Sequence, residues 1–411
     1  MIQKKPRVRV KKTIGTLLAA ACGLAGSVAT AEPGRIDAGP FKVEPALNTQ
    51  LAYIDNIYRA KDDEDGSMVL TISPAMVAFI ENGASRYEAH AEVRSETYFA
   101  ESDDDTLDVE FGIDLHHVLS NKQALDFFAG MNQTHEDRGA GLSQGGIGVS
   151  GNDEPIEYDE TTVGGRYTLG SNQTLGKLVI ELSDKDKEYQ NFRDTTEFFD
   201  HDTWTTSTAL YYNLSGKTAL VAEGRWEDVE YDQDKPGFAS LDAEEFTALV
   251  GVTWQATGKT TGHIKLGYFD REFDSASRED SDDLRWDAAI TWAPRTYSTL
   301  TFTAAQTSDE TRGFDPVVTG DFIERETVSL TWDHAFDDAT SMSIGYTSDN
   351  DEYSGSSGRE DERTRFSAGV KRALDRWIVL KAGYEYEELD SSNDPLSYDR
   401  NTFFIGLDMT L

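Results

Sequence analysis

The sequence contains a single cysteine among its 411 residues, and no apolar run is long enough for a membrane-spanning helix. That cysteine, Cys22, lies in a short apolar segment near the N-terminus, so the chain beyond it has none. Disulfides and thiolate metal sites are therefore excluded from the body of the protein. The G-x-S-x-G, H-E-x-x-H and phosphate-binding loop motifs are also missing, so no enzyme, no cofactor and no metal site is predicted.

Basic residues are scarce relative to acidic ones. The chain has 38 lysines and arginines against 75 aspartates and glutamates, a net charge of −37 that would repel the phosphates of a nucleic acid. Such acidity is also typical of disordered proteins, but an aromatic content of 11% argues against disorder. A hydrophobic fraction of 38% is low for a large globular core and suits a β-barrel, in which only half of each strand faces lipid.

The N-terminus has the features of a secretory signal peptide. Six lysines and arginines in Lys4–Lys12 precede the apolar run Ile14–Val28, and Ala29–Ala31 follows as an A-x-A cleavage site. The alternative, a single transmembrane anchor, needs a longer apolar run than this one. We therefore expect export in a bacterium and cleavage after Ala31, which leaves 32 bases against 75 acids and a net charge of −43.

Alternating apolar and polar residues recur from Ala46 to the end of the chain. In 107–115, for example, apolar side chains occupy every odd position and polar residues or glycine every even one. The last stretch, 402–411, also alternates, with one apolar face and one mostly polar face that includes Phe404. A period of two sustained over five pairs is typical of a strand with one apolar face and not of a helix.

The connections between these runs alternate in length. Eight short turns rich in Gly, Asn, Asp and Pro alternate with nine longer, acidic loops such as 59–66 and 135–155. Seventeen connections predict an all-β, antiparallel, up-and-down outer-membrane barrel of about 18 strands (16–18), with long outer loops and short periplasmic turns. We expect residues 1–31 to be the signal peptide, 32–45 a short periplasmic segment and 46–411 the barrel. A soluble sandwich or propeller would not require this alternation.

If the apolar face of each strand meets lipid, the opposite face lines the lumen. Charges of both signs occupy that face, and such a wall must be wet because unpaired charge in a dry interior is too costly. These residues either pair across strands and hold the barrel, or set the field through which a solute moves. The predicted pore-lining residues are Glu88, Glu92, Arg94, Asp108, Glu110, Arg166, Glu223, Arg225, Lys265, Arg271, Arg285, Arg365, Lys381, Glu385 and Asp408.

The loop 135–155 is the best candidate for a plug or constriction. It is the longest connection and contains the glycine-rich stretch GAGLSQGGIGVSGN. An 18-strand barrel is wide enough for an aqueous channel unless loops fold inward. Its charged residues, His135, Arg138, Asp153 and Glu154, are the candidate constriction residues; the alternative is a disordered surface loop.

Several short motifs resemble one family of outer-membrane proteins. The stretch 51–59, LAYIDNIYR, the second-strand motif Ile72–Pro74, the segment 273–306 and the closing motif Tyr398–Asn401 are similar, in this order, to the putative β-barrel porin 2 family. The resemblance covers essentially the whole chain after the signal peptide. It implies an outer-membrane barrel without catalytic residues, associated with export of exopolysaccharide or capsular polysaccharide.

Three functions follow as hypotheses. The first is a monomeric outer-membrane channel for polysaccharide export, which works with periplasmic export components. The second is a general diffusion porin for small solutes that favours cations because of the negative charge. The third is a structural or adhesive surface barrel that transports nothing. In each case the expected surroundings are outer-membrane lipid.

Overall fold

The structure is a computed structural model that describes residues 34–410 apart from 147, 148, 150, 152, 258 and 356. The predicted signal peptide and its cleavage site after Ala31 lie outside the described residues. Within them, no helix has the length and apolar character that a membrane crossing requires.

The described residues form one antiparallel sheet of nineteen strands, of which β1 is a short arm and the other eighteen form a closed barrel. Each barrel strand pairs with its neighbours in the chain, as predicted for an up-and-down barrel, and β19 pairs with β2 to close it. The strands are β1 Ile36–Ala38, β2 Phe41–Ile54, β3 Ser67–Asn82, β4 Ser85–Tyr98, β5 Thr106–Ser120, β6 Gln123–Glu136, β7 Ile156–Gly170, β8 Gly176–Tyr189, β9 His201–Ser215, β10 Thr218–Tyr231, β11 Ala243–Thr257, β12 Thr260–Phe273, β13 Ser281–Arg295, β14 Ser298–Glu310, β15 Phe322–Ala335, β16 Thr340–Tyr353, β17 Glu360–Asp375, β18 Ile378–Ser391 and β19 Tyr398–Thr410.

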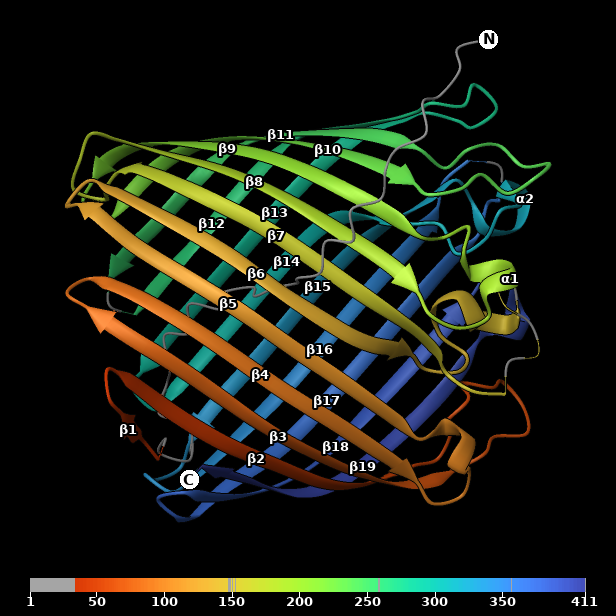
Figure 1. The fold of residues 1–411 in the computed structure, drawn as a ribbon, viewed down its shortest axis with the longest axis horizontal. Helices are drawn as coiled ribbons and strands as arrows, with labels where there is room; N and C mark the ends of the chain where they lie inside the picture. The colour runs from red at the N-terminus through yellow and green to blue at the C-terminus, as the bar shows by residue number, and fades with distance from the viewer. Residues whose placement is uncertain are drawn as a thin grey trace.

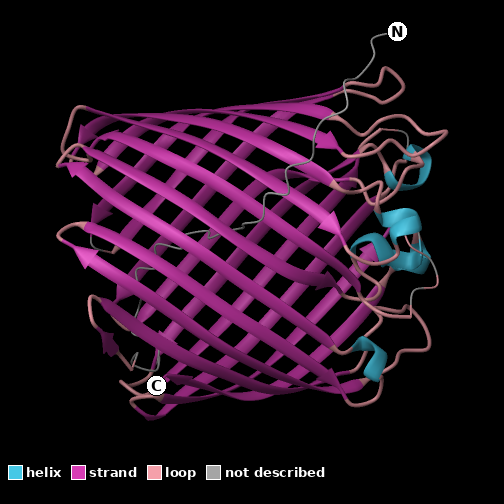
Figure 2. Ribbon diagram, viewed as in Figure 1, coloured by secondary structure: helices cyan, strands magenta, loops and turns pink. Residues whose placement is uncertain are grey.

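The two ends of the barrel differ in their connections. Turns of two to five residues join strands at one end, and loops of six to nineteen residues join them at the other (Figure 1). The helices α1 (Arg193–Thr196) and α2 (Pro316–Thr319) and the 3₁₀ turns η1 (Ser102–Asp104), η2 (Gly141–Gly146) and η3 (Asp394–Leu396) all lie in the long loops (Figure 2). The predicted alternation of long and short connections is confirmed, and we call the long-loop end the outer mouth.

The barrel closes where its first and last strands meet. The ladder runs from Thr402 opposite Ile54 to Thr410 opposite Ala46. Beyond it, β2 extends back to Phe41, five residues before the expected start of the barrel. This early stretch pairs with β3 on one side and with the short arm β1 on the other, so its edge does not stay open.

Side chains reinforce this seam across hundreds of residues of sequence. Asn48 donates a hydrogen bond of 2.8 Å to Asp408, and the side chain of Asn401 donates one of 2.7 Å to Asp55. Asn56 is fully buried and donates to the backbone carbonyl of Asp399 at 2.9 Å. These contacts fix the register, because a shift by one residue would turn each side chain to the other face.

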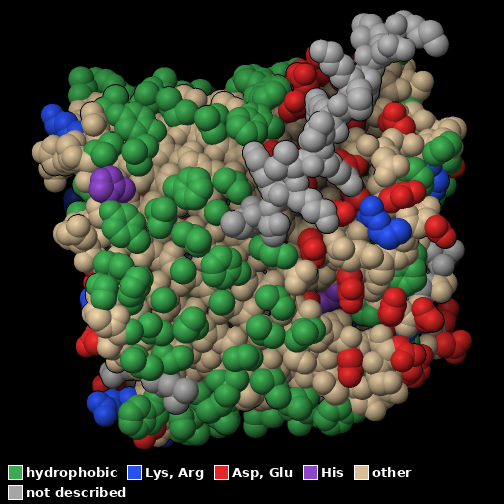
Figure 3. Space-filling view, in the orientation of Figure 1, with side chains coloured by type: hydrophobic (Ala, Val, Ile, Leu, Met, Phe, Trp, Pro, Cys, Tyr) green, Lys and Arg blue, Asp and Glu red, His purple; other side chains and the backbone are tan. Residues whose placement is uncertain are grey.

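Large apolar side chains cover the outside of the wall. Leu107 and Leu284, for example, are 65% and 73% exposed to solvent. On the face in view, hydrophobic side chains cover most of the length and acidic ones gather toward the outer mouth (Figure 3). The strands are 13–16 residues long, whereas a spanning strand needs about 9–11, so they rise above the lipid at the acidic end.

Removal of residues 403–411 should abolish barrel assembly, because β2 would lose the partner strand that closes the sheet. Heat-modifiable migration on detergent gels measures closure: we expect it to be lost. Deletion of 34–38 is the control, since β1 contributes only three register pairs outside the seam. A truncated protein that still shifts on heating would show that β19 does not close the barrel.

Candidate functional site

The inner wall carries ion pairs between strands. Lys265 on β12 contacts Glu223 on β10 at 3.0 Å and Asp287 on β13 at 2.7 Å. Lys381 on β18 contacts Asp408 on β19 at 3.0 Å. Because alternate residues of a strand share a face, each such pair also fixes which side of the strand points inward.

Most of the predicted pore-lining residues take part in ion pairs, either between strands or between alternate residues of one strand. Arg166 contacts Glu181 at 2.5 Å, Arg94 contacts Glu96 at 2.5 Å, Arg225 contacts Glu227 at 2.8 Å, Arg365 contacts Asp349 at 2.5 Å and Glu88 contacts Arg86 at 2.5 Å. Glu92 lies opposite Glu110 in register, Glu110 lies 3.5 Å from His90, and Glu385 is exposed. Whether these residues act on a passing solute stays a prediction.

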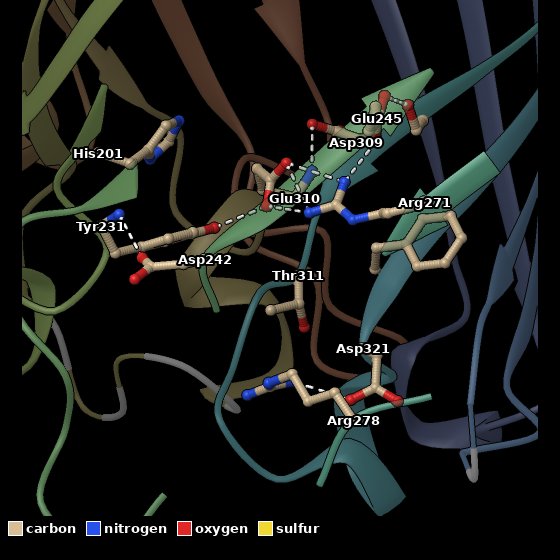
Figure 4. Close-up of polar contacts among 12 residues, drawn as sticks. His201, Tyr231, Asp242, Glu245, Arg271, Arg278, Asp309, Glu310, Thr311 and Asp321 are labelled. Atoms are coloured by element: carbon tan, nitrogen blue, oxygen red, sulfur yellow. Dashed lines mark hydrogen bonds and ion pairs between the residues drawn. The ribbon is translucent and has the colours of Figure 1, made fainter. Parts of the chain in front are cut away.

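Two of the predicted lining residues do not face water. Arg271 is 0% exposed and Arg285 is 6% exposed. Arg271 donates to Glu245 at 2.6 Å and to Glu310 at 2.9 Å (Figure 4), and the Arg285 guanidinium lies 3.7 Å from the centre of the Phe269 ring. These two side chains were expected to line a water-filled lumen, and their burial corrects that expectation. They are buried because a second segment of the chain, described below, packs against the inner face of the wall at this place.

The longest loop, 137–155, is anchored on one side of the outer mouth. At its root, His135 contacts Asp108 at 2.8 Å. Asp137 accepts a hydrogen bond of 2.8 Å from Arg59 in the β2–β3 loop. Arg138 contacts Asp104 of η1 at 3.1 Å, so the two preceding outer loops hold this side of the loop.

The same loop reaches the far side of the mouth. The side-chain oxygen of buried Gln144 accepts hydrogen bonds of 3.0 Å from Arg312 and from Arg359, which are 168 and 215 residues away in sequence. Arg312 lies in the β14–β15 loop and Arg359 in the β16–β17 loop, whereas the loop itself joins β6 to β7. The described part of the loop therefore crosses the mouth, and we call the described residues of 137–155 the plug.

Apolar side chains from several loops pack around the plug. Leu142 and Val149 of the plug join Phe199, Leu241 and Phe314, one from each of three other outer loops, in a buried cluster. The rings of Phe199 and Phe314 lie 4.3 Å apart. This cluster gives the outer mouth a small hydrophobic core of its own, so the loops hold one another in place.

The predicted constriction residues are thus divided. His135 and Arg138 lie at the root of the plug, whereas Asp153 and Glu154 are exposed beyond its buried part. No sequence signal marks Gln144, Arg312 or Arg359, because they lie in loops without periodicity. Only the fold brings them together.

Charge and burial tune the groups at the root of the plug. Burial acts to raise the pKa of Asp137, but hydrogen bonds from His135 and Arg59 and the Arg59 charge outweigh it and hold that pKa well below its usual range. Burial, followed by a hydrogen bond to Asp104, raises the pKa of Tyr58 to about 12. At neutral pH Asp137 is therefore an anion and Tyr58 a neutral phenol.

Two cavities flank the plug. One of about 530 Å³ is lined by Tyr58, Lys61, Arg138 and Gln144 together with Asp394 and Leu396 of η3. The other, of about 270 Å³, is lined by Glu136, Glu160, Lys185, Tyr189, His201 and Tyr231. Among the described residues, no cluster of three or more His, Asp or Glu side chains could hold a metal ion.

A closed barrel with an apolar outside, a charged inside and long loops at one end is an outer-membrane barrel of the porin-like channel class. The family model for "Putative beta-barrel porin 2" matches residues 31–411. The chain belongs to this family, as the motif resemblance predicted. No curated protein sequence shows significant similarity to it.

Solved structures match this chain at low identity. OpdK, an outer membrane protein from Pseudomonas aeruginosa, matches at 10% identity over 90% of this chain and 99% of that one, with a TM-score of 0.47. A BenF-like porin from Pseudomonas fluorescens Pf-5 matches at 11% identity over 90% and 99%, also with a TM-score of 0.47. The FrpB iron transporter from Neisseria meningitidis matches at 10% identity with a TM-score of 0.49. The match covers 86% of this chain but only 65% of FrpB.

The substitution Asp137→Asn should lower stability by about 0.5–2 kcal/mol, because it weakens hydrogen bonds to a charged group whose side chain is 38% exposed and therefore partly screened by water. Because the pKa of Asp137 is depressed in the folded protein, its contribution is fully present above the unfolded pKa of about 4 and is lost as pH falls through the folded value. The difference in Tm between native protein and variant should thus be constant from about pH 6, where His135 is fully protonated, to about pH 4, and should shrink below.

Asp153→Asn is the matched control, since Asp153 is exposed and should leave Tm unchanged. A difference for Asp137→Asn that already disappears between pH 7 and 5 would contradict the assignment of a depressed pKa.

Proposed function

We propose that the protein is a diffusion channel for small solutes, with a preference for cations. The observation that carries the proposal is the plug, which crosses the outer mouth and is held on both sides by hydrogen bonds. With the plug in place, the spaces beside it are about 530 and 270 Å³, sizes that suit single small molecules and not a thick polymer.

Charge supports the preference for cations. The chain has about twice as many acidic as basic residues, and carboxylates neutralise cations on the inner wall, as Glu223 and Asp287 do for Lys265. Glu92 and Glu110, opposite each other on β4 and β5, add negative charge to the wall. A negatively charged passage concentrates cations and repels anions.

Polysaccharide export is the second candidate. It is supported by the motif resemblance and by the strand number, because eighteen strands enclose an aqueous channel once loops move aside. In this version the protein is a monomer, periplasmic export components deliver the polymer, and the plug must leave the mouth. If deletion of the gene left secreted polysaccharide unchanged, export would be excluded.

The double substitution Glu92→Gln and Glu110→Gln should lower the cation-over-anion permeability ratio in planar bilayers by about two- to fivefold, as expected from the loss of two charges that act across water. The reversal potential in a salt gradient measures this ratio. Asp282→Asn, an exposed acid on the opposite side of β13 from inward Asp287, is the control and should leave the ratio unchanged. An anion-selective native protein, or one without conductance, would overturn the proposal.

A further inference from the structure

The ladder between β13 and β14 stops before either strand ends. Their pairs run from Asp287 opposite Ala305 to Arg295 opposite Ser298, although β13 begins at Ser281 and β14 continues to Glu310. On their other sides both strands stay paired to the tip: Ser281 with β12 and Glu310 with β15. The wall is therefore split at the outer mouth, between 281–286 of β13 and 306–310 of β14.

At this split, β14 and β15 pass inside the wall. Ser308 and Glu310 lie on the same side of β14 as exposed Phe302. Nearer the short-turn end of the strand, at Phe302, this side faces lipid. Yet Ser308 donates to Glu245 of β11 at 2.8 Å, and Arg271 of β12 donates to Glu310 at 2.9 Å (Figure 4). The outward face of the outer end of β14 thus lies against the inner face of β11 and β12.

Aromatic rings fill the space between the two layers. Phe322, at the start of β15, is fully buried and lies 6.1 Å from Phe269 and 6.4 Å from Phe273, ring centre to ring centre. Both partners are on β12. The overlap is therefore a packed contact and not a gap in the wall.

The tucked segment also helps to hold the plug in place. The loop 311–321 between β14 and β15 provides Arg312, which donates to Gln144 of the plug, and Phe314, which packs on Phe199. Glu310 accepts a further hydrogen bond of 2.7 Å from Tyr231 of β10. If residues 306–325 moved outward, the plug would lose one of its two far-side anchors and part of its apolar core.

The tucked arrangement leaves polar groups without partners. Within the described part of the chain, Arg285 Nε and Nη2, Arg271 Nε and Glu324 Oε1 are buried without a hydrogen-bond partner, and all four lie at the overlap. Buried polar atoms without partners destabilise the state that contains them. The ion pairs of Arg271 with Glu245 and Glu310 oppose this cost, so the free energy that favours the tucked arrangement is a difference between opposing contributions.

We propose that residues 306–325, the outer end of the β14–β15 hairpin, are a movable flap that regulates the channel. Tucked inside, the flap holds the plug and keeps the mouth narrow. When it swings outward, β14 extends its ladder with β13 in the existing register, which brings Leu284 opposite Ser308 and releases Arg312 and Phe314 from the plug. The inference rests on the proposed function for what opening permits, but the motion itself can be measured without transport.

A single cysteine on the flap, Ser308→Cys, can report both the tucked and the outward position. The experiment uses full-length protein in which Cys22→Ser removes the native cysteine. With Glu245→Cys the flap cysteine should form a disulfide in the tucked state, and with Leu284→Cys only after the flap swings out. Ala288→Cys with Ala304→Cys is the matched control, because this pair is already opposite in the ladder. Heat-modifiable migration shows that each variant is folded.

In liposomes under mild oxidation, we expect the control and tucked pairs to crosslink quickly and the Leu284 pair at least fivefold more slowly. Adding Glu310→Gln, which weakens the contact with Arg271, should accelerate the Leu284 pair at least fivefold. In bilayers, the Leu284 disulfide should raise conductance severalfold, the Glu245 disulfide should lower it, and a reductant should reverse both.

Two results would overturn the flap. The first is that the variant with Ser308→Cys and Leu284→Cys folds but never crosslinks, even with Glu310→Gln, while the control variant does. The second is a Leu284 pair that crosslinks as fast as the control in the absence of Glu310→Gln. If the crosslinking follows the expected order but no variant conducts, the flap stands and the diffusion channel fails.

Discussion

Everything else in this structure depends on closing the ladder of backbone hydrogen bonds. In lipid no water can replace a missing partner, so an unpaired N–H or C=O costs several kcal/mol and a sheet cannot keep an open edge. The pairing of β19 with β2 removes the edge, and Asn48, Asp55 and Asn401 hold it in register. Once the sheet is closed, each side chain of a spanning strand faces either lipid or lumen.

Closure also explains the chemistry of the inner wall. Charged side chains are tolerated inside because they are wetted and paired, as Lys265 is with Glu223 and Asp287. Such pairs hold strands together and at the same time set the field along the passage. The excess of acids over bases makes that field negative, which is why a channel favouring cations is the simplest use of the wall.

The demand for closure is weaker above the membrane. There water can hydrate backbone groups, so neighbouring strands no longer have to pair along their whole length. The split between β13 and β14 occurs at this end, where the tip of β14 exchanges its ladder for the contact between Glu310 and Arg271. The plug, the flap and the buried apolar cluster around the plug all lie at the outer mouth, where the constraint of the lipid ends.

The sequence by itself determined the wall. Alternation in stretches such as 107–115, turn residues at one end and long acidic loops at the other are local features, and they predicted a barrel of about eighteen antiparallel strands. Their physical basis is the two-residue period of a strand, which can be read without knowing the fold. The family was indicated separately, by the resemblance of short motifs such as LAYIDNIYR.

Only the tertiary structure decided what happens at the mouth. Gln144 meets Arg312 and Arg359 across more than 160 residues of sequence, and no periodic pattern records such loop contacts. The alternation along their strands places Arg271 and Arg285 on the side that faces the lumen. They are nevertheless buried, because the outer end of the β14–β15 hairpin packs against that side. The alternation along a strand determines on which side of the strand a residue lies, whereas what covers that side depends on distant parts of the chain.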